Sequence, residues 1–162
     1  GHRVPFIARW PGKINPGTSS NQTLNLTDLM ATCAAMADAK LPSKAAEDSY
    51  NLLPALRGQV PAGTMVRPDT LHQTISLAIA IRSGPWKYLD HKGSGGNDYG
   101  RPHLKPFLLK ENAPSAGGQL YNLDDDPGET TNLALKYPAR VKEMKARLEE
   151  YKSSGRSVPT RK

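Results

Sequence analysis

The sequence lacks the features that identify disulfide-rich proteins, cysteine-based metal sites and membrane-spanning helices. Its one cysteine, Cys33, excludes an intrachain disulfide and any metal site built from several cysteines. No uninterrupted apolar run approaches the roughly 20 residues that a membrane helix needs. The first residues contain no basic segment followed by an apolar stretch, so no signal peptide is expected within this sequence.

The positive charge is abundant but unevenly placed. The chain has 162 residues and a net charge of +7, and residues 136–162 hold nine of the 22 Lys and Arg but three of the 15 Asp and Glu. A basic tail of this kind could bind an anionic polymer or a membrane surface. A solvated helix face that ends in a frayed terminus explains the same charges more simply.

The first third of the chain predicts a strand followed by a helix. Val4–Trp10 is apolar on both faces, as in a strand covered on both sides of a sheet. Thr27 or Asp28 is a suitable cap for the helix that follows. The helix repeats apolar residues with helical spacing, so we expect this face, with Cys33 as a packed core thiol, to be buried; its residues are Leu29, Met30, Cys33, Met36 and Ala37.

The remainder predicts a small sheet and a terminal helix. Thr74–Arg82 alternates like a half-buried strand and Trp86–Leu89 returns as its hairpin partner, whereas residues 91–118 predict a long loop. Gln119–Leu123 predicts a third strand. Pro138 suits the first position of a helix whose apolar stripe is Val141, Met144, Leu148 and Tyr151.

No local motif for catalysis or metal binding is present. The acidic turn Asp124–Asp126 with Glu129 lacks the ligand spacing of a calcium-binding EF-hand loop. The four histidines are scattered, and no serine lies in a G-x-S-x-G turn. Taken alone, the residues indicate an α/β or α+β domain without assigning it a function.

Four segments nevertheless carry a resemblance. Gly1–Gly12 resembles a G-x-R-x-P strand that ends in W-P-G, and Leu26–Thr32 resembles a "tDl-x-PT" helix start with Ala31 in place of the usual proline. Ala80–Tyr88 resembles an "aiR-x-g-x-wKy" hairpin, and Leu120–Leu133 resembles "eLYdL-x-x-Dp-x-E-x-x-Nl". In this order they resemble the formylglycine-dependent sulfatases, most of all the arylsulfatases of marine polysaccharide-degrading bacteria.

The resemblance implies an α/β fold of the alkaline-phosphatase-like sulfatase type and the C-terminal part of it. Residues 1–60 would supply the last strand and helix of the large domain with a linker. Residues 65–162 would form a small α+β subdomain, in which an antiparallel sheet packs on the C-terminal helix. We expect residues 1–60 to fold poorly alone, because their strand has no parallel partner in this sequence.

The resemblance also implies the chemistry of the parent enzyme. In that family a cysteine in C-x-P/A-S-R becomes formylglycine and attacks sulfur, while a calcium ion held by Asp and Asn withdraws charge from the sulfate. The segment around Cys33 is not that motif. The nucleophile, the calcium ligands and an active-site lysine would all precede Gly1. We therefore expect no catalytic residue, no metal ligand and no bound cofactor in this chain, which would be inactive alone.

Three residues remain candidates for substrate contact. His2 and Arg3 would directly follow the lysine segment and could approach bound sulfate or sugar, although a structural ion pair explains Arg3 equally well. His72 lies at the mouth of the first strand of the small subdomain and is a weaker candidate. The 91–118 loop could also border the substrate.

The implied partners are a sulfated small molecule or sulfated polysaccharide and the N-terminal part of the same enzyme. Export to the periplasm or the outside is expected from the family, and neither nucleic acid nor a membrane is expected to bind. One alternative is a non-catalytic module that binds an anionic glycan or nucleic acid through the basic C-terminal helix. Another is a non-catalytic homologue that pairs with a second chain.

Overall fold

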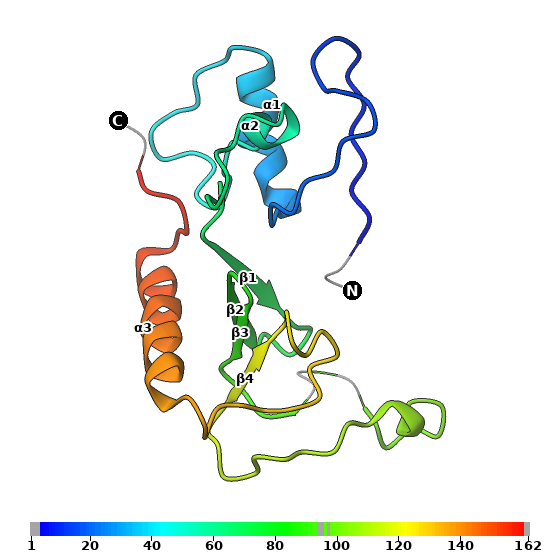
Figure 1. The fold of residues 1–162 in the computed structure, drawn as a ribbon. Coiled ribbons are helices and arrows are strands. Elements are labelled where there is room, and N and C mark those ends of the chain that lie inside the picture. The colour runs from blue at the N-terminus through cyan, green and yellow to red at the C-terminus, as the bar shows by residue number, and fades with distance from the viewer. Residues whose placement is uncertain (1–3, 94–95, 97, 161–162) are drawn as a thin grey trace. The chain divides into compact units, whose positions relative to one another are not determined.

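The computed structural model describes residues 4–93, 96 and 98–160, which form two compact units. The first unit comprises the chain up to Thr70 together with the segment from Tyr151 onward. The second unit is Leu71–Glu150. Figure 1 labels the helices and strands and colours the chain by residue number.

The first unit is mostly irregular and contains three short helical segments. They are the 3-10 turn η1 (Leu26–Asp28), α1 (Leu29–Met36) and α2 (Leu53–Leu56). The predicted strand at Val4–Trp10 is wrong, because these residues are irregular and Ile7 is 92% exposed. A two-sided apolar strand needs neighbours that complete its hydrogen bonds and cover both faces, and the described chain supplies none here.

The helix start and the position of its cap were predicted correctly, but its buried face was not. Asp28 is the N-cap of α1, although its side chain makes no capping hydrogen bond there. Asn25 caps the preceding turn η1, because its side chain accepts from the Thr27 amide while the Asp28 carboxylate accepts from the Asn25 amide. The side chains of α1 that are buried are Ala31 and Thr32. Cys33 is exposed rather than a packed core thiol. The face that the spacing assigned to the core therefore faces solvent.

The four-stranded antiparallel sheet has the order β1-β2-β3-β4. It belongs to the second unit except for the first two residues of β1, which the first unit includes. Its strands are β1 (Asp69–Gln73), β2 (Ile79–Ser83), β3 (Trp86–Leu89) and β4 (Gln119–Asn122). The predicted hairpin is confirmed, with Ser83 opposite Trp86, and β4 pairs with β3.

The strand predicted at Thr74–Arg82 is wrong at its start. Thr74–Ala78 is a turn closed by a hydrogen bond from the Thr74 amide to the Ala78 carbonyl, at 2.9 Å. Leu77, which alternation placed in the strand, is 72% exposed and has a φ of +63°. Strand β1 lies before this turn and ends at Gln73. The sequence pattern did not predict it, and the sheet therefore has one more strand than that pattern indicated.

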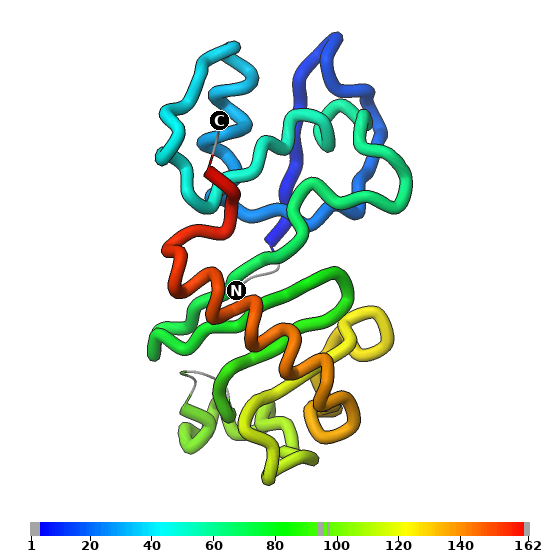
Figure 2. The backbone as a smooth tube through the Cα atoms, turned by 90° about the vertical axis from the view of Figure 1, so that its left-hand side faces the viewer, coloured from blue at the N-terminus to red at the C-terminus, as the bar shows by residue number. Residues whose placement is uncertain are grey.

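Helix α3 (Pro138–Ser154) packs along this sheet, as Figures 1 and 2 show. Met144 and Leu148 are its buried residues, and Leu148 is completely inaccessible to solvent. The Arg147 guanidinium donates to the Ser83 hydroxyl of β2 at 3.1 Å. The prediction of a small antiparallel sheet packed on a C-terminal helix is confirmed.

A long connection joins β3 to β4. Within its described residues the one regular segment is the 3-10 turn η2 (Lys105–Phe107). Phe107, Leu108 and Leu109 expose more than half of their side chains. Across the described residues, no helix combines the length and the apolar content needed to cross a membrane.

Candidate functional site

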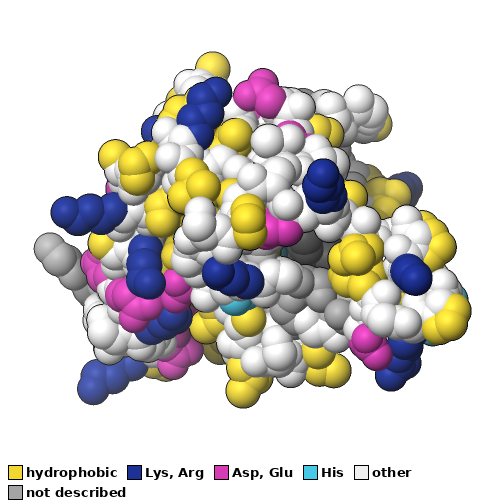
Figure 3. All heavy atoms as spheres, turned by 90° about the horizontal axis from the view of Figure 1, so that it is seen from below, with side chains coloured by type: hydrophobic (Ala, Val, Ile, Leu, Met, Phe, Trp, Pro, Cys, Tyr) yellow, Lys and Arg dark blue, Asp and Glu magenta, His cyan; other side chains and the backbone are white. Residues whose placement is uncertain are grey.

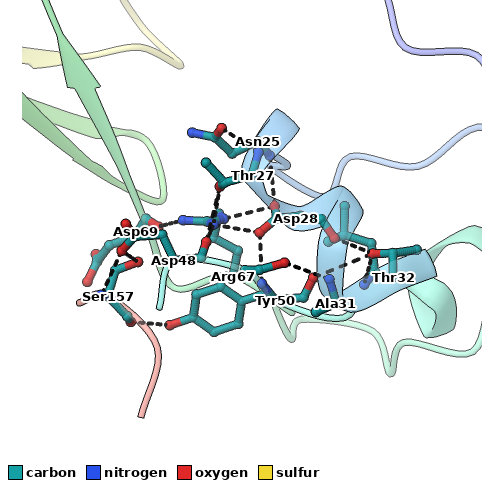
Figure 4. Close-up of polar contacts among 12 residues, drawn as sticks. Asn25, Thr27, Asp28, Ala31, Thr32, Asp48, Tyr50, Arg67, Asp69 and Ser157 are labelled. Atoms are coloured by element: carbon teal, nitrogen blue, oxygen red, sulfur yellow. Dashed lines mark hydrogen bonds and ion pairs between the residues drawn. The ribbon is translucent and has the colours of Figure 1, made fainter. Parts of the chain in front are cut away.

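The most organised polar cluster in the first unit is an ion pair between Asp28 and Arg67. The Arg67 guanidinium donates to both oxygens of the Asp28 carboxylate, with Nε–Oδ2 at 3.0 Å and Nη2–Oδ1 at 2.5 Å. Both side chains are almost completely buried, with 2% and 0% exposed. Figure 4 shows the pair between α1 and the chain that leads into β1. Such a bidentate pair fixes the geometry of both side chains.

Asp28 and Arg67 also make hydrogen bonds to neighbouring backbone groups. The Asp28 carboxylate also accepts from the amides of Asn25 and Tyr50, at 2.8 and 2.9 Å. Arg67 also donates to the carbonyl oxygens of Asp69, through Nη1, and of Asp48, through Nη2. Neither charged group is therefore available as a general acid, a general base or a substrate ligand, and the cluster is structural.

Tyr50 connects this cluster to the end of the chain. The guanidinium of Arg67 lies 4.8 Å from the centroid of its ring. The Tyr50 hydroxyl donates to the Ser157 carbonyl at 2.8 Å, and the Ser157 amide and hydroxyl both donate to Asp48. Burial raises the pKa of the Tyr50 phenol, and nearby Asp69 and Asp28 raise it further against the opposing effect of Arg67. This phenol is therefore a neutral donor rather than a proton-transfer group near neutral pH.

A second, partly buried ion pair lies in the second unit. Lys87 of β3 donates to both carboxylate oxygens of Glu129, each at 2.8 Å, and the Lys87 side chain is 6% exposed. Nearby, the Asn132 side chain accepts from the amides of Leu120 and Ala134 and donates to the Gly118 carbonyl. These contacts fix the chain after β4 against the sheet.

The acidic turn that follows β4 is held by hydrogen bonds from neighbouring residues to the Asp126 carboxylate. The Asp126 carboxylate accepts from the amides of Thr130 and Thr131, both at 2.8 Å, and from the Thr130 hydroxyl at 3.0 Å. Partial desolvation disfavours its ionised form, but these hydrogen bonds outweigh that effect and lower the pKa of Asp126. The turn is a closed loop held by one aspartate.

Comparison with known proteins decides the family. Over 94% of its length the chain is 33% identical to an N-acetylgalactosamine-6-O-sulfatase of Bacteroides thetaiotaomicron. It is 32% identical over 83% of its length to an ulvan-active sulfatase of Formosa agariphila, and 34% identical over 82% to arylsulfatase A of Bos taurus. The chain belongs to the sulfatase family. It spans 28%, 29% and 26% of the length of these three relatives, and it is similar to a C-terminal part of a sulfatase.

Solved structures agree on the sulfatase fold. A Bacteroides thetaiotaomicron structure from work on glycosaminoglycan metabolism matches with a TM-score of 0.73 and 30% identity, over 92% of this chain and 29% of that one. The structure of Ps i-CgsB with k-i-k-neocarrahexaose matches with a TM-score of 0.60 and 22% identity, over 88% of this chain and 27% of that one. The predicted fold class is confirmed. No protein-family model matches the chain.

The segments that carry the sulfatase resemblance prove to hold the fold together. Asp28, the acidic residue of the helix start, binds Arg67. Lys87 of the hairpin segment and Glu129 of the closing segment bind each other. Sequence reasoning missed Arg67 altogether, because a residue 39 positions from its partner has no local spacing to reveal it. Lys87 and Glu129 were both noted, but their pairing across 42 positions was likewise invisible.

The residues predicted to contact substrate are not gathered into one described site. His2 and Arg3 lie outside the described residues. His72 lies in β1 and is half-buried. Among the described residues, no group of three or more His, Cys, Asp or Glu side chains is placed to hold a metal ion. Cys33 lies in Thr32–Met36, whose sequence is not the C-x-P/A-S-R motif. The residues described here thus do not fit a calcium or formylglycine site.

Proposed function

We propose that the whole protein hydrolyses sulfate esters and that this chain forms its C-terminal part, inactive by itself. The observation that carries the proposal is the similarity to sulfatases at 33% identity over 94% of the chain, together with the shared fold. Since the chain spans about a quarter of those relatives, the chemistry would depend on residues beyond the matched part. Calcium and formylglycine belong to this proposal for the whole enzyme, and no catalytic step is assigned to residues of this chain.

The proposed substrate is a sulfated carbohydrate or an aryl sulfate. One relative is named for N-acetylgalactosamine sulfate, and one structure contains the substrate D-glucosamine-2-N,6-O-disulfate, so sugars are acted on by two members of the fold. The structure with D-glucosamine-2-N,6-O-disulfate has a TM-score of 0.62 and is 19% identical to this chain, and so it supports the fold alone. Export to the periplasm or beyond is part of the same proposal.

The candidate substrate contacts are His2, Arg3, His72 and the 91–118 connection. Phe107 with Leu108 and Leu109 would present apolar surface there, next to the basic side chains of Lys105 and Lys110. An exposed ring with adjacent cations suits the apolar face and the sulfate of a charged sugar. These side chains would act by positioning the substrate, because none of them belongs to the chemistry assigned to the whole enzyme.

The test uses the full-length protein with 4-nitrophenyl sulfate and a sulfated monosaccharide. Variants His2→Ala, Arg3→Ala and His72→Ala should each lower kcat/KM by about tenfold or more, as expected for the loss of about 1.4 kcal/mol of transition-state binding. Gln73→Ala is the matched control, because Gln73 is the exposed neighbour of His72 on β1. Unchanged kcat/KM in all three variants would show that these residues do not bind the substrate. Absence of any sulfate release by the full-length protein would contradict the proposed activity.

The alternative of a module that binds anions through α3 has less support. Arg140 lies 4.8 Å from the centroid of the Trp86 ring, Lys145 pairs with Asp90 at 3.3 Å, and Arg147 contacts Ser83. Much of the basic charge of the helix is thus already used within the second unit. On the face in Figure 3, basic side chains lie scattered among acidic and apolar ones.

A further inference from the structure

The connection between β3 and β4 is tied together at its base. The Lys92 ammonium donates to the Pro114 carbonyl at 3.0 Å, which joins the start of the connection to its end. The Asn112 side chain donates to the Thr130 carbonyl at 2.9 Å and accepts from the Asn132 amide at 2.8 Å. A long loop that is anchored by its own contacts is a common carrier of function.

Residues 101–110, which we call the η2 segment, project from this anchored base. Figure 1 shows η2 apart from the four strands. The amides of Leu104 and Lys105 donate to the Arg101 carbonyl, at 3.0 and 2.9 Å, and fix the first turn of the segment. Two prolines restrict its backbone further. Because the segment is ordered by its own backbone, it loses little conformational entropy when a ligand binds.

The η2 segment carries positive charge and no negative charge. Its basic residues are Arg101, Lys105 and Lys110, and it contains no Asp or Glu. Arg101 pairs with Asp98 at 3.3 Å. Lys105 and Lys110 are exposed, and neither has a hydrogen bond or an ion pair to any residue that the structure describes. Two such cations on one short segment raise the local concentration of an anionic ligand.

Three consecutive apolar side chains lie between these two lysines. Phe107, Leu108 and Leu109 are 68%, 59% and 54% exposed. A sugar ring has C–H groups on its faces, and packing them against an aromatic ring removes apolar surface of both partners from water. The lysines can bind sulfate groups at the same time through charge-assisted hydrogen bonds. The segment thus offers both kinds of contact that a sulfated sugar can make.

We propose that the η2 segment binds a sulfated polysaccharide at a sugar other than the one that loses its sulfate, so that the whole enzyme prefers a polymer to a small sulfate ester. This rests on the proposed function. The cations are distributed along the segment, which suits charges that repeat along a polymer, whereas one sulfate group needs donors that converge on it. Binding energy from such a remote contact is available only to a substrate long enough to reach it.

The composition of the segment argues against other occupants. Proteins that bind single-stranded nucleic acid stack successive bases on several aromatic rings, and Phe107 is the one aromatic residue of the segment. An amphipathic helix on a membrane needs a continuous apolar side, but the chain leaves the 3-10 turn at Leu108, which has an extended conformation. Burial beneath another part of the fold is disfavoured by the unpaired lysines, because lysine is almost never buried without a partner.

The test uses the full-length protein with three sulfated polysaccharides, chondroitin 6-sulfate, ulvan and ι-carrageenan, and with 4-nitrophenyl sulfate as the small ester. Lys105→Ala/Lys110→Ala should raise the Kd of the polysaccharide that binds best by at least about threefold, as expected for the loss of two exposed ion pairs. Phe107→Ala should raise the same Kd by about tenfold, because the sugar no longer covers an aromatic ring. In both variants the loss should exceed any loss of kcat/KM for 4-nitrophenyl sulfate.

The matched control is Lys40→Ala/Lys44→Ala, which removes the same charge from two exposed lysines of the first unit. It should leave the Kd of the polysaccharide unchanged. The salt dependence of binding should become shallower in Lys105→Ala/Lys110→Ala and stay as it is in the control, because fewer counterions are released when fewer cations bind the polymer.

Four outcomes would overturn the proposal. They are failure to bind any of the three polysaccharides, an equal loss of affinity in the control, tighter binding to vesicles of anionic phospholipid than to any polysaccharide, and a lower Tm of Phe107→Ala with equal losses on polymer and small ester. The last would mean that the segment packs within the fold. Release of sulfate from 4-nitrophenyl sulfate without polysaccharide binding overturns this proposal and leaves the proposed function standing. Polysaccharide binding that depends on Lys105 and Lys110, without release of sulfate from any substrate, supports the η2 segment and counts against the proposed function.

Discussion

At the scale of single residues, the Asp28–Arg67 pair dominates the first unit. Arg67→Met should lower the free energy of unfolding by about 3–5 kcal/mol, because it leaves the Asp28 carboxylate buried and without its counter-charge. The measurement is urea unfolding at neutral pH. Asp28→Leu combined with Arg67→Met should recover much of the loss, since two apolar residues leave no uncompensated charge.

The matched control for that prediction is the exposed pair Arg101–Asp98, whose side chains are 65% and 64% exposed. Arg101→Met should change the free energy of unfolding by no more than about 1 kcal/mol, because exposed ion pairs contribute little. An equal effect of the two arginine substitutions would contradict the structural role given to Arg67.

Tyr121 gives a residue-scale prediction about alkaline pH. Burial, followed by the nearby Glu111 and Glu129, raises the pKa of its phenol to about 12. Between a pH near 10, where the unfolded chain loses this proton, and about 12, the unfolded state binds fewer protons than the folded state. Stability contributed by the neutral phenol is thus complete below pH 10 and falls as the pH rises to 12. Thermal unfolding of Tyr121→Phe across this range should show a shallower fall in Tm than the unsubstituted protein.

At the scale of elements, α3 is the part that the sequence described best. The stripe at Val141, Met144, Leu148 and Tyr151 predicted the helix, and two of its members are its buried residues. Leu148→Ala should destabilise the second unit by about 2–5 kcal/mol, because it leaves a cavity between helix and sheet. Lys142→Ala, on the exposed side of the same helix, should have little effect. Near-equal midpoints for the two variants in urea unfolding would show that the helix does not pack as described.

The elements also show where sequence reasoning stops. Periodicity identified α3 and the β2–β3 hairpin because both bury their pattern within the described chain. The same rule failed for Val4–Trp10 and for α1. Apolar periodicity shows which face of an element requires burial, but it does not show whether the chain contains the element that would pack against that face. It failed again at Thr74–Ala78, where a turn with Leu77 at positive φ interrupts an alternating run. Of the candidate site, the motif residues could be named from sequence, but their pairing over about 40 positions could not.

At the scale of the whole molecule, the end of the chain belongs with its beginning. The compact unit that contains α1 also includes the segment from Tyr151 onward. Ser157 and Val158 donate their amides to the Glu47 carbonyl, at 3.2 and 2.9 Å, and the Tyr50 hydroxyl donates to the Ser157 carbonyl. Arg67 and Ser157, which lie within residues 65–162, thus bind Asp28 and Asp48 of residues 1–60.

Truncation after Gly155 tests this arrangement by hydrogen exchange. The truncated chain loses every contact of Ser157, so the Tyr50 and Leu52 amides, bonded to Asp28 and Thr32, should exchange faster. The amides of β2, β3 and β4 should keep their protection, since Ser157 and Val158 bind the first unit. Ser157→Ala is the graded control, because it removes one hydroxyl bond and leaves the backbone bonds in place, and it should have a smaller effect in the same direction. Loss of protection spread evenly over α1 and the sheet would instead mean that the chain unfolds as one cooperative body.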